Sequence, residues 1–70
     1  NNMRYTVTYT MYIEAKNDKH AVSKAEMIAE REQAKYPNQR CEMEKLHCTP
    51  FASLQTREVD INKIKMEKYA

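Results

Sequence analysis

The chain has 70 residues and a net charge of +2, and its composition excludes several kinds of site before any motif is considered. It contains no glycine, so the Gly-rich loops that cradle phosphates and the GXXG clamp of KH domains are ruled out. Its two cysteines are too few for the framework of a disulfide-rich secreted domain. No stretch approaches the roughly 20 apolar residues of a membrane span, and no signal segment opens the chain. We therefore expect one domain over residues 1–70, located in the cytoplasm.

Residues 4–15, RYTVTYTMYIEA, alternate between two kinds of side chain. One set is apolar: Tyr5, Val7, Tyr9, Met11, Ile13 and Ala15. The other set is mostly polar: Arg4, Thr6, Thr8, Thr10, Tyr12 and Glu14. A period of two predicts a long strand, and threonine and tyrosine suit its pleated surface. We expect the apolar face to carry the core and the threonine-rich face to remain open.

The following residues change to the period of a helix. Asn17 or Asp18 is the expected N-cap, because a short polar side chain there accepts a backbone N–H of the first turn. The helix is predicted to run to Lys35, with Tyr36-Pro37 ending it because proline disfavours helical geometry in the residue before it. One stripe of this helix is apolar: Ala21, Val22, Ala25, Ile28, Ala29 and Tyr36.

Residues 40–49, RCEMEKLHCT, concentrate reactive residue types. Strict alternation leaves neither face apolar, whereas a bulge near Glu44-Lys45 buries every apolar residue and turns His47 outward. The inward residues would then be Cys41, Met43, Leu46 and Cys48. Along a strand the two cysteines lie about 20 Å apart, too far for a disulfide, and no CxxC pair suggests zinc. We predict a second strand here, with no catalytic residue, no cofactor and no metal.

The C-terminal part of the chain leaves two alternatives open. Phe51 and Leu54, in the connection after Pro50, are expected to tuck against one end of the core. Val59 and Ile61 alternate, and two further apolar residues alternate in the opposite phase, which favours a third strand with an irregularity at residues 62–63. A short C-terminal helix with Asp60 as its N-cap is the alternative for residues 60–69.

These elements predict an α+β fold of order β-α-β-β, in which one helix packs on one face of a three-stranded mixed sheet. This arrangement resembles half of a ferredoxin-like fold. The first two strands would be parallel, joined by a right-handed crossover through the helix, and the third would run antiparallel. The second face and at least one edge of such a sheet are uncovered, so we expect a two-fold homodimer.

The sequence favours a small non-enzymatic binding or regulatory protein, that is, an accessory protein that acts through a protein–protein interface. Small chains without catalytic residues often have such roles, including many encoded by phages. The possible interface residues are those of the open face: Thr6, Thr8, Thr10 and Tyr12. The alternative is weak nucleic-acid binding through basic residues near the C-terminus, although acidic residues interleave with them. These are Arg57, Lys63, Lys65 and Lys68. A third hypothesis, the least favoured, is a small enzyme whose site forms between subunits.

Overall fold

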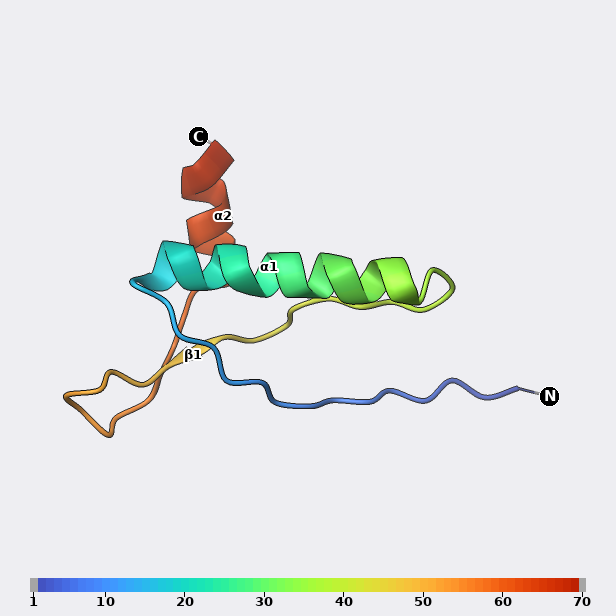
Figure 1. Ribbon diagram of the computed structural model, residues 1–70, viewed down its shortest axis with the longest axis horizontal. Coiled ribbons are helices and arrows are strands. Elements are labelled where there is room, and N and C mark those ends of the chain that lie inside the picture. The colour runs from blue at the N-terminus through green and yellow to red at the C-terminus, as the bar shows by residue number, and fades with distance from the viewer. Residues whose placement is uncertain (1, 70) are drawn as a thin grey trace.

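The computed structural model describes residues 2–69, with the side chains of residues 2–67. Two helices and two short strands follow one another (Figure 1): α1 (Asp18–Lys35), β1 (His47–Cys48), β2 (Arg57–Glu58) and α2 (Ile61–Tyr69). β1 and β2 form a two-stranded sheet. The predicted fold is therefore wrong, because it had one helix on a three-stranded mixed sheet. Within the described residues, neither helix is long and apolar enough to cross a membrane.

The helix α1 begins and ends where the sequence predicts. The side-chain oxygen of Asn17 accepts the backbone N–H of His20 at 2.9 Å, which makes Asn17 the N-cap. At the other end the N–H of Tyr36 donates to the carbonyls of Glu32 and Gln33. The predicted apolar stripe supplies Val22, which is only 3% exposed. The predicted bounds and N-cap are confirmed, whereas Tyr36, the last residue of the predicted stripe, is 48% exposed.

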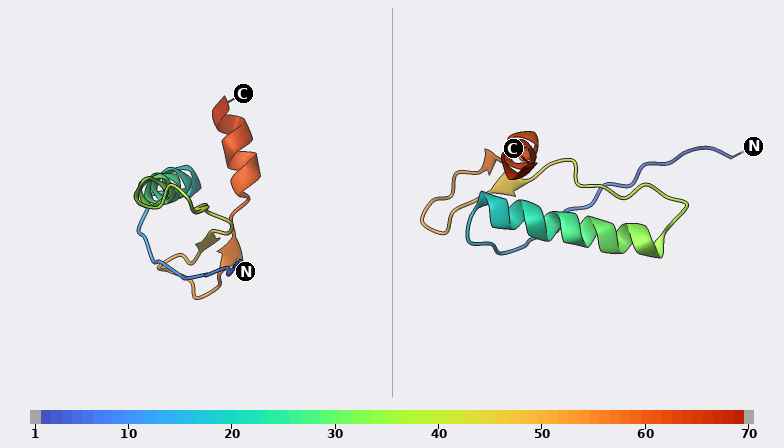
Figure 2. Two further views of the ribbon diagram at one scale, coloured as in Figure 1. Left: turned by 90° about the vertical axis from the view of Figure 1, so that its right-hand side faces the viewer. Right: turned by 90° about the horizontal axis from the view of Figure 1, so that it is seen from above.

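The predicted first strand is wrong. Residues 2–15 contain no paired strand in the structure, and they run as a long trace past the C-terminal end of α1 (Figures 1 and 2). Val7, expected in the core, is 83% exposed. The two strands of the described residues, β1 and β2, pair with each other, so residues 2–15 have no partner strand. The residues that follow Gln39 are instead bound to α1. The side chain of Gln33 accepts the N–H of Cys41 at 3.0 Å and donates to the carbonyls of Tyr36 and Gln39.

Residues 41–48 follow the bulged facing that the sequence favours. The half-buried side chains are those of Cys41, Met43, Leu46 and Cys48. Those between them are exposed: Glu42, Glu44, Lys45 and His47. The facing is thus confirmed, but a paired strand forms only at β1, so the longer predicted strand is wrong. Burial against the rest of the chain sets the facing without any ladder of backbone hydrogen bonds over residues 41–45.

β1 and β2 pair antiparallel, with His47 opposite Glu58 and Cys48 opposite Arg57. The pairing extends by one bond, from the N–H of Val59 to the carbonyl of Leu46 at 2.8 Å. The orientation is the one expected for the second and third predicted strands, over a much shorter length. The connection between them projects as a loop (Figure 1).

The prediction that Phe51 and Leu54 tuck against the core is wrong, because both lie on this projecting loop. They are 98% and 97% exposed. The loop is held at its base by a hydrogen bond between the hydroxyls of Thr49 and Thr56 at 2.7 Å. It is also turned by the N–H of Ser53 donating to the carbonyl of Pro50. These polar contacts shape the loop without bringing its apolar side chains to the body of the molecule.

The C-terminal alternative, a helix capped by Asp60, is what the structure shows. The Asp60 carboxylate accepts the N–H of Lys63 at 3.0 Å, so the third predicted strand ends before α2. Ile61, Ile64 and Lys65 are partly buried, and spacings of three and four place them on one side of the helix. α2 contacts α1, and the Lys65 ammonium lies 3.4 Å from the Glu26 carboxylate.

The molecule is open for its size. Among the described residues, only Val22 and Val59 are buried hydrophobic side chains. The accessible surface is 6864 Å², whereas a compact monomer of 8.3 kDa exposes about 4,600 Å². The radius of gyration is 14.3 Å, against about 11 Å for a compact 70-residue domain. The projecting N-terminal segment and the hairpin loop are visible sources of this excess (Figure 1).

Candidate protein–protein interface

Residues 2–13, which we name the N-terminal arm, have the sequence of a strand and no strand partner. None of the hydrogen bonds between described residues involves a backbone group of the arm. Four large apolar side chains of its predicted core face are exposed: Tyr5, Val7, Tyr9 and Met11. An extended segment with a free row of N–H and C=O groups is a template for pairing with another chain. The arm is therefore the strongest candidate interface of the described residues.

The base of the arm is fixed to α1. The Lys24 ammonium donates to the carbonyl of Glu14 at 2.6 Å, and the N–H of Lys16 donates to Nδ1 of His20 at 3.0 Å. Ile13, at the end of the arm, is partly buried. The exposed part of the arm thus starts from a defined position on the helix.

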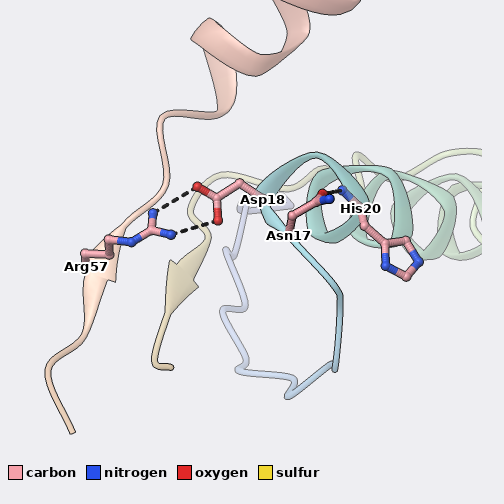
Figure 3. A network of polar contacts seen from close by, with 4 residues as sticks. All are labelled: Asn17, Asp18, His20 and Arg57. Atoms are coloured by element: carbon pink, nitrogen blue, oxygen red, sulfur yellow. Dashed lines mark hydrogen bonds and ion pairs between the residues drawn. The ribbon is translucent and has the colours of Figure 1, made fainter. Parts of the chain in front are cut away.

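Asp18 and Arg57 form a second attachment, between the start of α1 and β2 (Figure 3). Both guanidinium end nitrogens of Arg57 donate to the Asp18 carboxylate at 2.9 Å, a bidentate ion pair. These hydrogen bonds hold the pKa of Asp18 below its usual value, although partial burial opposes the shift. The same contact raises the pKa of Arg57. The pair joins residues that are 39 positions apart and so holds the hairpin beside the base of the arm.

The structure exposes both faces of the arm. The possible interface residues named from the sequence, Thr6, Thr8, Thr10 and Tyr12, are all exposed, Tyr12 by 94%. Sequence reasoning misses the apolar face as a candidate, because its alternation also fits the core of the same chain. A signal was present in the composition: Leu, Ile, Val and Phe total only ten residues, few for a domain that covers a long strand by itself.

The basic residues named for nucleic-acid binding are not gathered into a free cationic surface. Arg57 is paired with Asp18, and Lys65 is paired with Glu26. Lys63 is exposed on α2, and the side chain of Lys68 lies outside the described residues. An open depression of about 700 Å³ next to them is lined by both signs of charge, including Asp60, Lys63 and Glu67. Its mixed lining offers a phosphate backbone as much repulsion as attraction.

The reactive residue types of RCEMEKLHCT differ in their exposure. Cys41 and Cys48 are free and half-buried, whereas His47 is exposed. Within residues 2–67, no group of three His, Cys, Asp or Glu side chains is placed to hold a metal ion. No protein-family model, curated protein or solved structure matches the chain.

Proposed function

We propose that the chain is a small non-enzymatic binding or regulatory protein that acts through a protein–protein interface built on the N-terminal arm. The observation that supports this most directly is the combination found there. The arm has strand alternation, an unpaired backbone and exposed apolar side chains, on a base fixed to α1. The matching binding mode is strand addition, in which main-chain hydrogen bonds supply affinity and alternate side chains supply specificity.

The apolar face supplies a driving force for such binding. Full burial of a valine, methionine or aromatic side chain contributes about 1.5–3 kcal/mol. Tyr5, Val7, Tyr9 and Met11 are each more than half exposed in the free chain, so most of this contribution is still available to a partner. Association costs about 4–15 kcal/mol in lost translational and rotational freedom. The backbone hydrogen bonds and the apolar contacts of the arm must together offset this cost.

The nucleic-acid alternative receives less support from the charges. The arm contains a single basic residue, Arg4, and two of the four basic residues named near the C-terminus have carboxylate partners. A phosphate would have to displace Asp18 or Glu26 from these ion pairs. Nucleic-acid binding with a steep loss of affinity on adding salt would contradict the proposal and favour this alternative.

The experiment is a pull-down from an extract of the native host, with the full chain as bait. We expect a host protein that binds the wild type and does not bind Val7→Arg. The arginine would place a charge on the apolar face, and burying a charge without an opposite charge or hydrogen bonds is costly. Leu54→Arg is the matched control, because Leu54 is a similarly exposed apolar residue on the hairpin loop. A partner lost with the control and retained with Val7→Arg would contradict the arm as the interface.

We also propose the cytoplasm as the compartment. Cys41 and Cys48 are both free thiols, and a reducing compartment keeps thiols in this state. Targeting of a fluorescent fusion to the secretory pathway would contradict this assignment.

A further inference from the structure

We propose that a second copy of this chain occupies the arm, so that two arms pair antiparallel about a two-fold axis that passes between their Tyr9 residues. In this register Val7 lies opposite Met11 of the other copy, and Arg4 lies opposite Glu14. This inference rests on the proposed function, since it names the occupant of the same interface. It follows from three properties of the arm and its base: the positions of its charges, the alternation of its faces, and the area that the free chain leaves exposed.

The charges select the register. Arg4 and Glu14 are the only charged residues between positions 2 and 15. With Tyr9 opposite Tyr9, each Arg4 faces a Glu14 of the other copy, and symmetry forms this pair twice. A shift by two residues in one direction sets Arg4 against Tyr12, and in the other direction against Lys16. A parallel arrangement brings like charges together. Opposite charges stabilise directly opposed positions and like charges destabilise them, so the central register is preferred.

The same register keeps the two faces distinct. On the apolar face Tyr5 meets Ile13, Val7 meets Met11, and the two Tyr9 side chains meet at the axis. On the other face Thr6 meets Tyr12 and Thr8 meets Thr10. Aromatic, aliphatic and threonine pairs of this kind stabilise antiparallel sheets. A shift by one residue would oppose apolar side chains to threonines, which the alternation of the arm disfavours.

The free chain leaves a large area exposed, which the arm and the hairpin loop share. The chain exposes roughly 2,300 Å² more than a compact monomer of its mass, whereas a standard interface buries about 800 Å² on each partner. A two-stranded ribbon in isolation is marginal in water. Here Lys24 and His20 fix the base of each arm to its own α1, so the ribbon would be anchored to a helix at both ends.

The register is tested by disulfide trapping in the full chain. Cys41→Ala and Cys48→Ala remove the native thiols, and Tyr9→Cys places one new thiol at the axis. Opposed Cα atoms in an antiparallel pair are about 4.5–5.5 Å apart, within the range of a disulfide. We expect mild oxidation to give a covalent dimer. Tyr12→Cys in the same background is the control, because the two copies of position 12 would lie about 20 Å apart and should not join.

The charges are tested by exchange. Arg4→Glu or Glu14→Arg alone places like charges opposite each other, and we expect each to raise the dimer dissociation constant about 3- to 30-fold. The double variant Arg4→Glu/Glu14→Arg restores both opposite-charge pairs and should return the constant to near the wild-type value. Circular dichroism of each variant checks that the helices are intact, which the exposure of the arm leads us to expect.

Sedimentation equilibrium separates this inference from the proposed function. A mass of twice the 8.3 kDa chain, together with trapping at position 9 and rescue by charge exchange, supports the inference. A dimer that traps at position 12 instead, or that persists after deletion of residues 2–13, overturns it. A monomer at about 100 µM, well above the dissociation constants of specific assemblies, also overturns it. If that monomer captures a host protein in a Val7-dependent manner, the proposed function stands; if it captures none, both fail.

Discussion

The N-terminal arm and α1 have equally regular sequences, and only one of them forms its secondary structure within the chain. α1 satisfies its backbone hydrogen bonds through residues four positions away, so its period and caps suffice to form it. The arm has a strict period of two, but a strand needs hydrogen bonds from a second strand. Alternation therefore predicts the extended conformation of a segment and the division of its faces, but not whether the same chain or another supplies the partner strand.

The largest difference in stability between the arm and α1 is expected from substitution of two valines, one buried and one exposed. Val22→Ala in α1 should lower the free energy of unfolding by about 1–3 kcal/mol, because it removes buried methyl groups from a very small core. Val7→Ala in the arm should change it by less than about 0.5 kcal/mol, because an exposed side chain loses no packing. Urea denaturation followed by circular dichroism measures both.

The difference in the free energy of unfolding between these two variants should depend on protein concentration. At low concentration, where arms are unpaired, the large difference is expected. At high concentration Val7→Ala should become costly if arms pair between copies. Equal costs at low concentration would mean that the arm packs on its own chain, and the distinction between the two regions would be lost.

Local signals in the sequence predicted what depends on local contacts. Asn17 and Tyr36-Pro37 bound α1 correctly, and the bulged facing of residues 41–48 follows from placing every apolar side chain inward. The lack of a partner strand for residues 4–15 was not predictable, because it depends on the position of residues that are distant in the sequence. A single side chain, Gln33, helps to hold residues 39–41 against α1 by binding the backbone at Gln39 and Cys41. A glutamine on a helix carries no sequence signal for such a role.

For the same reason, the sequence predicts the exposure of one face of the arm and not of the other. Thr6, Thr8, Thr10 and Tyr12 were assigned to an open face, and they are exposed. The opposite face was assigned to the core, since alternation gives each residue a face but does not reveal whether the chain itself covers that face. In the C-terminal segment, the weak alternation favoured a strand, but a helix forms from Ile61 onward. Its N-terminus is capped by Asp60.

An intermediate effect is expected from the helix cap. Asn17→Ala removes the acceptor of the His20 N–H and should cost about 1 kcal/mol of stability. Asn2→Ala is the matched control in the arm, where the side chain is exposed and no helix begins. Thermal unfolding of both variants should show a lower midpoint for the first alone. A lower midpoint for Asn2→Ala as well would indicate that the arm takes part in the folded monomer.

The smallest effect is expected from the Asp18–Arg57 pair, which is partly exposed and therefore weakened by solvent. The pKa of Asp18 is lower in the folded state than its usual value of 3.8. The pair therefore contributes stability that is fully present above that usual value and is lost as the pH falls through the lowered folded pKa. Asp18→Asn should remove part of the stability at neutral pH and flatten the dependence below about pH 4.

The measurement is chemical denaturation at a series of pH values, with Glu44→Gln as a control at an exposed carboxylate. Only Asp18→Asn should change how steeply the free energy of unfolding depends on pH in the acid range. Asp18 is held by a bidentate arginine, whereas Glu44 is not. Because the pair holds β2 beside the start of α1, its loss should also increase hydrogen exchange of the hairpin amides. At a protein concentration low enough to keep the arms unpaired, the arm amides should exchange rapidly in both variants, because they have no hydrogen bonds within the chain. At such a low concentration, slower exchange in the arm than in the hairpin would contradict the contrast between the arm and α1.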